Sequence, residues 1–167
     1  KIGRLHQIRL FQDEDLYADL TAEIVASSKP GRKSAQLTRR YHFAAAHRLH
    51  DPQRSEPDNL RLYGACGGPQ AHGHNYVLHV TVAGDIDPDT GMVTHLSALD
   101  RVVQDAVLNR LDHQDLNVVP ELSAVRPTGE NLARFVWNRL VKAIPGGRLA
   151  RVGLDETRDV SYEYAGS

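Results

Sequence analysis

The sequence contains one cysteine, Cys66, among its 167 residues. A single cysteine excludes an internal disulfide framework and leaves a free thiol. Chains that carry free thiols and no disulfides are typical of reducing compartments, so we expect a cytoplasmic protein.

Long apolar segments and an excess of one charge are also absent. No apolar run approaches the ~18–20 residues of a transmembrane helix, and the N-terminal residues lack the apolar core of a signal peptide. We therefore expect no membrane segment. The formal net charge is −1 and no basic run is longer than two residues. We therefore expect neither nucleic acid nor an anionic membrane surface as a partner.

What is present is the composition of an ordinary globular chain. Hydrophobic residues make up 41% of it and charged residues 25%, close to the average for soluble domains. A chain of this length buries roughly 70% of the surface that its unfolded form exposes. We therefore expect one main domain whose core needs no disulfide or structural metal.

The first 38 residues differ in pattern from the rest. Leu16, Leu20 and Ile24 lie four residues apart, which is typical of one face of a short amphipathic helix, and Asp13 is suited to cap it. The segment "SSKPGRKSAQ" has the small, polar and turn-forming residues of a linker. The sequence thus predicts an N-terminal extension over 1–38, with a helix and a linker, and a domain over 39–167.

Within the domain, alternating apolar residues predict strands and a period of 3.6 residues predicts helices. The expected strands cover four segments: 37–47, 72–84, 149–157 and 160–164. The expected helices cover two: 95–111, and 130–144 after the N-cap Thr128. The simplest arrangement is an α+β fold in the order ββααββ, with a four-stranded antiparallel sheet and both helices on one face.

Three histidines are candidates for a metal site. His72 and His74 are two residues apart on a predicted strand, so their side chains point the same way about 6.6 Å apart. His47 ends the other N-terminal strand on the face of Phe43 and Ala45. Three histidines without a fourth protein ligand are typical of a catalytic zinc with an open position. The same spacing also fits partly buried, hydrogen-bonded histidines that bind no metal.

Six motifs carry a family resemblance. They are "FAAAHRL", "NLRLYGACGGPQAHGHNY", "GDIDPDTGMV", "LDHQDLN", "PTGEN" and "LDET", in this order over residues 39–165. The sequence resembles the tetrahydropterin synthase family, and the five-residue gap between Cys66 and His72 resembles its pyruvoyl-forming branch. The resemblance implies the T-fold, or tunnelling fold, in which three subunits join their sheets into a barrel and two trimers stack as a hexamer. Active sites then lie between the subunits of a homo-oligomer.

The resemblance also implies roles for nine residues of this sequence. The zinc ligands are His47, His72 and His74. The catalytic residues are Cys66, a base, with Asp112 and His113. The residues that hold the pterin are Glu156, Thr128 and Glu130. One departure concerns Gly129, which stands where close relatives often have threonine, so that one pterin contact is in doubt.

The expected reaction converts 7,8-dihydroneopterin triphosphate, a small-molecule substrate, into 6-pyruvoyltetrahydropterin with elimination of triphosphate, as in tetrahydrobiopterin biosynthesis. Cys66 can act as the base if a nearby zinc ion and the imidazolium of His113 lower its pKa from the usual ~8.5. The alternative is a 6-carboxytetrahydropterin synthase of queuosine biosynthesis, which releases acetaldehyde. A third possibility is a non-catalytic T-fold protein that binds pterin. The candidates to bind the triphosphate are Arg40, Arg48 and Arg61, and the sequence favours none of the three over the others.

Overall fold

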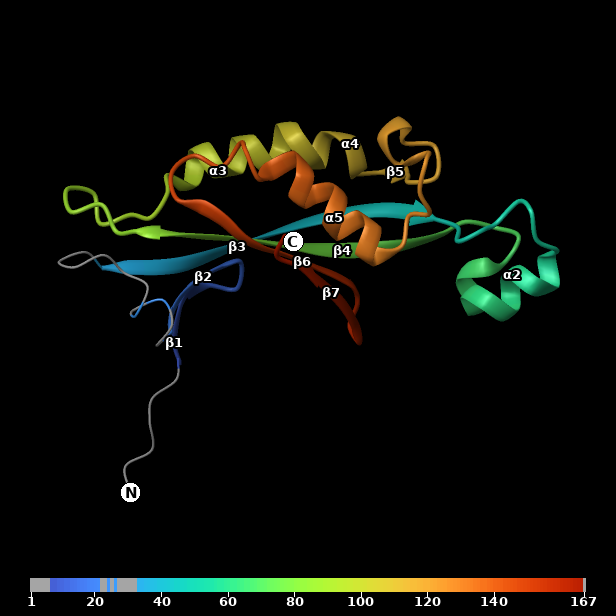
Figure 1. Ribbon diagram of the computed structural model, residues 1–167, viewed down its shortest axis with the longest axis horizontal. Helices are drawn as coiled ribbons and strands as arrows, with labels where there is room; N and C mark the ends of the chain where they lie inside the picture. Colours follow the sequence, from blue (N-terminus) through green and yellow to red (C-terminus); the bar gives the residue numbers. More distant parts are fainter. Residues whose placement is uncertain (1–6, 22–23, 25, 27–32, 167) are drawn as a thin grey trace, which may run out of the picture.

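The computed structural model describes residues 7–21, 24, 26 and 33–166. One sheet, antiparallel except for one short strand, is covered on one face by helices (Figure 1). The strands are β1 Gln7–Asp13, β2 Leu16–Thr21, β3 Ser34–His47, β4 His72–Asp85, β5 Gln114–Asp115, β6 Arg148–Thr157 and β7 Val160–Tyr164. The α-helices are α2 Glu56–Tyr63, α3 Leu96–Val103, α4 Asn109–Leu111 and α5 Gly129–Leu140. Shorter helical segments are η1 Gly64–Gly67, η2 Gln104–Leu108 and η3 Pro120–Leu122.

The sheet has the order β1-β2-β3-β4-β6-β7, and β5 pairs with β3 in parallel. The central pair, β3 and β4, stays in register over 14 residues, from Ser34 opposite Asp85 to His47 opposite His72. The last residues of β3 and the first of β4 therefore lie at the same end of the sheet. This end carries the candidate site.

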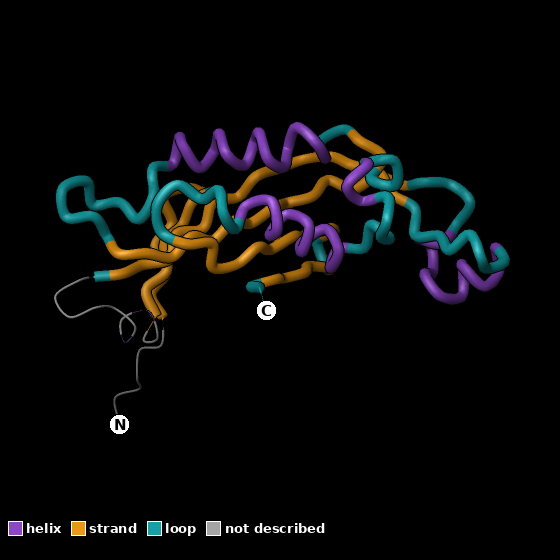
Figure 2. Tube along the Cα trace, turned by 45° about the horizontal axis from the view of Figure 1, so that its top comes forward, coloured by secondary structure: helices purple, strands orange, loops and turns teal. Residues whose placement is uncertain are grey.

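The core lies between the sheet and the helices, which form a separate layer in Figure 2. Alternate residues of β4, namely Tyr76, Leu78, Val80 and Val82, are buried on this face because side chains two apart on a strand point the same way. The helical segment 96–111 and α5 contribute the other side of the core: Leu99, Val103, Leu111, Leu132, Val136 and Leu140. Each such side chain stabilises the fold by about 1.5–3 kcal/mol when fully buried. The helix layer thus fixes one face of the sheet and leaves its end accessible.

The predicted helix in the N-terminal extension is wrong at Leu16 and Leu20, whereas Ile24 is helical. Leu16 and Leu20 lie on β2, which forms a hairpin with β1 and pairs with residues 36–39 of β3. Side chains on a strand alternate between its two faces, so residues four apart share one face of a strand as well as one face of a helix. The edge of β3 decides between them, because pairing with it satisfies the backbone of β2. Asp13 accepts a hydrogen bond from the backbone of Asp15 in the hairpin turn and caps no helix.

The hairpin and β5 bring the described sheet to seven strands, where the sequence predicted four. The predicted strands correspond to β3, β4, β6 and β7, and the helices over 96–111 and α5 lie on the same face of the sheet (Figure 1). Residues 34–36, predicted as linker, belong to β3, whereas residues 27–32 of the predicted linker lie outside the described residues. In the described part of the chain, no helix is long and apolar enough to cross a membrane.

Candidate active site

The three histidines expected to bind a metal come together at the end of the β3–β4 pair. His47 is the last residue of β3, and its backbone lies opposite His72, while His74 lies opposite Ala45. One ring nitrogen from each of the three lies within 4.8 Å of those of the other two. Because positions two apart share a face, the strand register alone directs all three rings to one point.

The hydrogen bonding of His47 leaves one of its nitrogens available. Its Nδ1 lies 2.8 Å from the backbone oxygen of Pro127, which can only accept, so Nδ1 carries the hydrogen. The Nε2 atoms of His47 and His74 are buried and make no hydrogen bond of regular geometry with a described residue. Their neighbour is the Glu156 carboxylate, whose Oε1 lies 3.1 Å from the first and 3.3 Å from the second. A bound metal ion would satisfy both atoms, so the residues present fit a metal site.

The charge states of the rings also suit a metal. Burial lowers the pKa of His72 and of His74, and both rings are therefore neutral at pH 7, the form that binds metals. Burial also lowers the pKa of His47, but the interactions with Glu156 and the Pro127 carbonyl outweigh it and raise this pKa. His47 thus has the strongest interaction with the neighbouring carboxylate.

Glu156 places a buried carboxylate beside the histidines. It lies where the register between β6 and β7 shifts, between Asp155 and Thr157, and such a bulge redirects a side chain. Its Oε1 is 3.1 Å from His47 Nε2 and 3.3 Å from His74 Nε2, and only 9% of the residue is exposed. The contact with His47 lowers the pKa of Glu156, although burial opposes this, so the carboxylate is ionised at neutral pH.

Cys66 lies on η1, in the glycine-rich segment between α2 and β4. The backbone nitrogen of Leu49 donates to the Cys66 carbonyl at 2.9 Å, and Arg48 donates to the Gly68 carbonyl. Gly67 packs so tightly on the carbonyl of Asn59 that a Cβ atom would overlap it. These contacts hold the cysteine segment against the residues that follow His47.

The Cys66 thiol is electrostatically linked to Glu156. Burial raises its pKa, and the negative charge of Glu156 raises it further. The thiol is therefore neutral at pH 7 in the absence of a ligand. A positive charge at the histidines, or a ligand that neutralises Glu156, would favour the thiolate.

Asp112 and His113 form a pair of their own. Asp112 Oδ1 lies 2.9 Å from His113 Nδ1 and accepts a hydrogen bond from the backbone of Ala44. His113 has a φ of 58°, and it is the one non-glycine residue with positive φ in the described part of the chain. Among the described residues, no hydrogen bond or ion pair joins His113 to Cys66 or to the three histidines. Its side chain is 80% exposed.

Two of the residues expected to hold the pterin, Thr128 and Glu130, lie at the start of α5. Thr128 is the N-cap of α5 and accepts a hydrogen bond from the backbone of Asn131. Thr128 directly follows Pro127, whose carbonyl bonds His47. Glu130 is exposed in the first turn of α5, and its charge contributes to the raised pKa of Tyr162. Thr128 is thus next to the residue that bonds His47, and Glu130 acts on Tyr162, which bonds Glu156.

Two tyrosines at the site escaped the sequence reasoning. The Tyr162 hydroxyl donates to Glu156 Oε2 at 3.0 Å, and burial together with Glu156 raises its pKa to about 12. The Tyr76 ring stacks on Phe43, and its buried hydroxyl has no partner among the described residues. Leu154 pairs with Tyr162 across the short hairpin β6–β7, which places Tyr162 on the core face. Pairing the two predicted strands in this way could have identified Tyr162 as a residue of the site.

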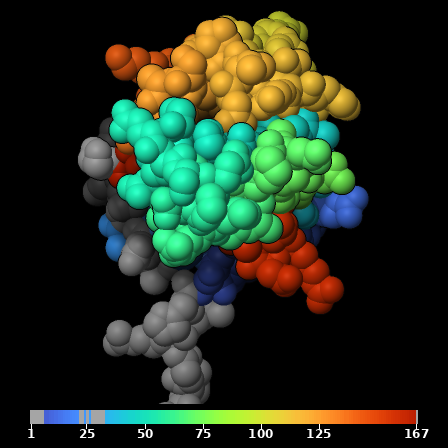
Figure 3. All heavy atoms as spheres, turned by 90° about the vertical axis from the view of Figure 1, so that its right-hand side faces the viewer, coloured from blue at the N-terminus to red at the C-terminus, as the bar shows by residue number. Residues whose placement is uncertain are grey.

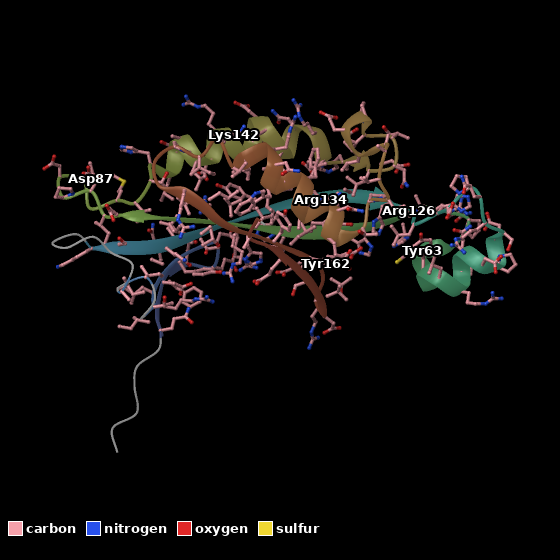
Figure 4. All side chains as sticks on the ribbon, in the orientation of Figure 1. Tyr63, Asp87, Arg126, Arg134, Lys142 and Tyr162 are labelled. Atoms are coloured by element: carbon pink, nitrogen blue, oxygen red, sulfur yellow. The ribbon has the colours of Figure 1, made fainter. Side chains whose placement is uncertain are left out.

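Segments from different parts of the chain meet at this end of the molecule. In Figure 3, which looks onto this end, the segment near residue 60 faces the viewer and the segment near residue 125 lies above it. Arg126 and Asp51 join two of these segments through an ion pair of 2.8 Å, and Figure 4 shows the labelled Arg126 and Tyr63 toward the same end of the molecule. The site is therefore built by segments that are far apart in the sequence.

Comparison with known proteins identifies the family. A family model described as 6-pyruvoyl tetrahydropterin synthase matches residues 36–167. The human 6-pyruvoyl tetrahydrobiopterin synthase is 43% identical over 136 residues, which cover 81% of this chain and 94% of that protein. A dihydroneopterin monophosphate aldolase of Pyrococcus furiosus is 36% identical over 95 residues, 56% of this chain and 77% of that protein. The solved structure of the Caenorhabditis elegans 6-pyruvoyl tetrahydropterin synthase superposes with a TM-score of 0.75 at 32% identity, over 80% of this chain and 96% of that one. The chain belongs to the 6-pyruvoyl tetrahydropterin synthase family.

Proposed function

We propose that this protein converts 7,8-dihydroneopterin triphosphate into 6-pyruvoyltetrahydropterin and releases triphosphate. Membership of the family and the names of its relatives support this activity. The observation that carries the proposal is the meeting of three histidines, whose ring nitrogens lie within 4.8 Å of one another, beside the buried carboxylate of Glu156. Such a site combines a place for a metal with an anchor for a cationic or hydrogen-bond-donating ligand.

The proposed metal is zinc, held by His47, His72 and His74. Nitrogen ligands suit zinc, and three protein ligands are usual where the ion takes part in catalysis. Held by these three histidines, the ion would supply Lewis-acid polarisation of a substrate hydroxyl group. The contact between His47 and the Pro127 carbonyl supports the assignment, because metal-binding histidines usually donate their second N–H to such an acceptor.

Glu156 is the proposed anchor for the pterin ring. The 2-amino and ring N–H groups of a pterin form a pair of donors that matches the two acceptors of a carboxylate. Thr128 and Glu130 would contribute further contacts from the start of α5. The unpartnered hydroxyl of Tyr76 supports a polar ligand here, because a buried hydroxyl normally has a partner.

Cys66 is the proposed base that removes side-chain protons from the substrate. Its raised pKa in the free chain has two causes, burial and the charge of Glu156. Donors of the pterin on Glu156 would offset that charge and so favour the thiolate. Because a base of this kind must remain a free thiol, we propose a reducing, cytoplasmic setting.

Asp112 and His113 are proposed to act on the Cys66 of a neighbouring subunit in a trimer or hexamer built by the T-fold. The exposure of His113 and its lack of contact with Cys66 in the described chain support this arrangement. In the contact with Asp112, Nδ1 faces the carboxylate at 2.9 Å, which orients the ring. The residues of one site would then come from two chains.

The test is product analysis by mass spectrometry after incubation of the zinc-loaded protein with 7,8-dihydroneopterin triphosphate. We expect 6-pyruvoyltetrahydropterin and triphosphate from the wild type. Cys66→Ala should keep its zinc and lose roughly 10²–10⁴-fold in rate. Release of acetaldehyde would instead indicate the 6-carboxytetrahydropterin synthase reaction, and binding without turnover would indicate a pterin-binding protein.

A further inference from the structure

Tyr162 holds one oxygen of the Glu156 carboxylate. Oε1 faces His47 and His74, whereas Oε2 accepts a hydrogen bond of 3.0 Å from the Tyr162 hydroxyl. Among the described residues, Tyr162 is the one hydrogen-bond donor to Oε2. Because Glu156 lies at a β-bulge, its backbone pairing alone does not fix the orientation of its side chain. The two oxygens are therefore oriented from opposite sides, by the histidines and by Tyr162.

The ring of Tyr162 occupies the space that a side chain at position 129 would need. A Cβ atom on Gly129 would overlap the Cε2, Cδ2 and Cζ atoms of this ring. Gly129 does not have a positive φ, so its backbone conformation is open to other residues. Glycine also weakens a helix relative to alanine. The requirement for glycine at the start of α5 therefore comes from the tyrosine ring.

Tyr164 provides an internal comparison. It lies two residues further along β7 on the same face, and its ring packs against Trp137 with 5.6 Å between centroids. The described residues offer its hydroxyl no hydrogen-bond partner. Tyr164 thus shows what a tyrosine with a purely packing role looks like on this strand.

We propose that Tyr162 is a positioning residue that orients the Glu156 carboxylate for the pterin ring, and that Gly129 provides the space for it. This inference rests on the function proposed above. A carboxylate oxygen has two lone pairs, so Oε2 can accept from Tyr162 and from the ligand at the same time. Tyr162 would then act on pterin affinity and leave the proton transfers unaffected.

The experiment compares Tyr162→Phe with Tyr164→Phe in the zinc-loaded protein. The KM and kcat are measured with 7,8-dihydroneopterin triphosphate, and the Kd of neopterin, a stable pterin probe, is measured by fluorescence. We expect Tyr162→Phe to raise KM and this Kd roughly tenfold, the loss expected for a hydrogen bond to a charged group. Its kcat, zinc content and Tm should match those of Tyr164→Phe, which should resemble the wild type.

Two further variants separate positioning from packing. Gly129→Ala should displace the ring and weaken neopterin binding like Tyr162→Phe. In a Glu156→Gln background, Tyr162→Phe should change the neopterin Kd less than it does in the wild type, because the two residues act through one hydrogen bond. A full, additive effect in that background would overturn the inference.

The outcomes also separate this inference from the proposed function. If the wild type turns over its substrate but Tyr162→Phe behaves like Tyr164→Phe, the positioning role is wrong and the function stands. Tighter neopterin binding by Tyr162→Phe would likewise overturn it, because the hydroxyl would then compete with the ligand. If the wild type neither turns over the substrate nor binds neopterin, both proposals fail.

Discussion

The pairs Glu156–His47 and Asp112–His113 consist of the same chemical groups in opposite surroundings. The first pair is 3.1 Å apart with side chains 9% and 1% exposed, and the second is 2.9 Å apart with side chains 39% and 80% exposed. The buried pair has its partners within one chain: a carbonyl, two more histidines and a tyrosine hydroxyl. The exposed pair presents its imidazole to the outside. The comparison suggests that one chain supplies the metal and pterin anchors, and that its neighbour supplies the proton-transfer pair.

The largest expected effect concerns the exposed pair. His113→Ala and Cys66→Ala should each lose roughly 10²–10⁴-fold in rate, because each removes a proton-transfer group. When the two variants are unfolded and reassembled together, about a quarter of the sites should receive both wild-type residues if a site is shared between chains. Activity measured before and after mixing checks this.

The control is a mixture of Cys66→Ala with wild type, which reports how well reassembly works. A mixture of the two variants that stays inactive while this control recovers would place Cys66 and His113 within one chain. The inference that the Asp112–His113 pair acts on a site of the neighbouring chain would then be wrong.

Glu156→Gln should have the next largest effect. The substitution keeps the size of the side chain but replaces a carboxylate acceptor by an amide donor, so neopterin affinity should fall roughly 100-fold from the loss of charged hydrogen bonds. Asp112→Asn, the same change in the exposed pair, should lower kcat and leave neopterin affinity within about twofold, since a group that acts on proton transfer adds little to ground-state binding. Equal losses of affinity in both variants would contradict the division of roles.

Metal removal should affect stability through the cluster of His47, His72 and His74 and not through the exposed pair Asp112–His113. Zinc that exceeds its Kd about 100-fold stabilises the folded protein by about 2.7 kcal/mol, so chelation should lower the Tm of the wild type. His74→Ala should have a low Tm with or without chelator, whereas His113→Ala should respond like the wild type. Thermal unfolding with and without chelator measures this difference, and a His113→Ala protein that has lost its zinc would contradict it.

The smallest effect lies in the N-terminal hairpin, outside both pairs. Buried Asp19 accepts hydrogen bonds from Gln7 and Arg9, which hold its pKa below the usual value although burial opposes them. Asp19→Asn should lower the free energy of unfolding by about 1–3 kcal/mol and leave kcat unchanged.

The pH dependence of this loss has a defined sign. A carboxylate with a lowered pKa stabilises the fold above the unfolded-state pKa, near 3.9 for Asp, and this stability is lost as the pH falls through the lower folded value. The difference between the wild type and Asp19→Asn should therefore be largest at neutral pH and shrink on acidification. A difference that grows toward low pH in denaturant unfolding would contradict the ion pair.

The histidine cluster could be predicted from the sequence, and the N-terminal hairpin could not. The two-residue period of strands puts His72 and His74 on one face and His47 on the core face of its own strand. The register of β3 with β4 then brings the three together. The spacing of Leu16 and Leu20 fits both periods, and the free edge of β3 determines the outcome. The pattern of side chains along the sequence therefore predicted the structure correctly where it fitted only a strand, and failed where it fitted both a strand and a helix.

The partners of the site were less accessible to sequence reasoning. The Pro127 carbonyl that orients His47 is a backbone group and leaves no mark in the side-chain pattern. Tyr162 reaches Glu156 because of a bulge and a glycine on a different element, α5. A motif search finds groups that react, whereas the groups that orient them depend on tertiary contacts.

The central claim is that one chain binds zinc and pterin while the next chain contributes His113. The most direct measurement is a crystal structure of the assembled protein with zinc and neopterin. We expect zinc on His47, His72 and His74, the pterin on Glu156, and His113 of an adjacent chain beside Cys66. Zinc bound elsewhere, or His113 remote from every Cys66 in the assembly, would contradict the account.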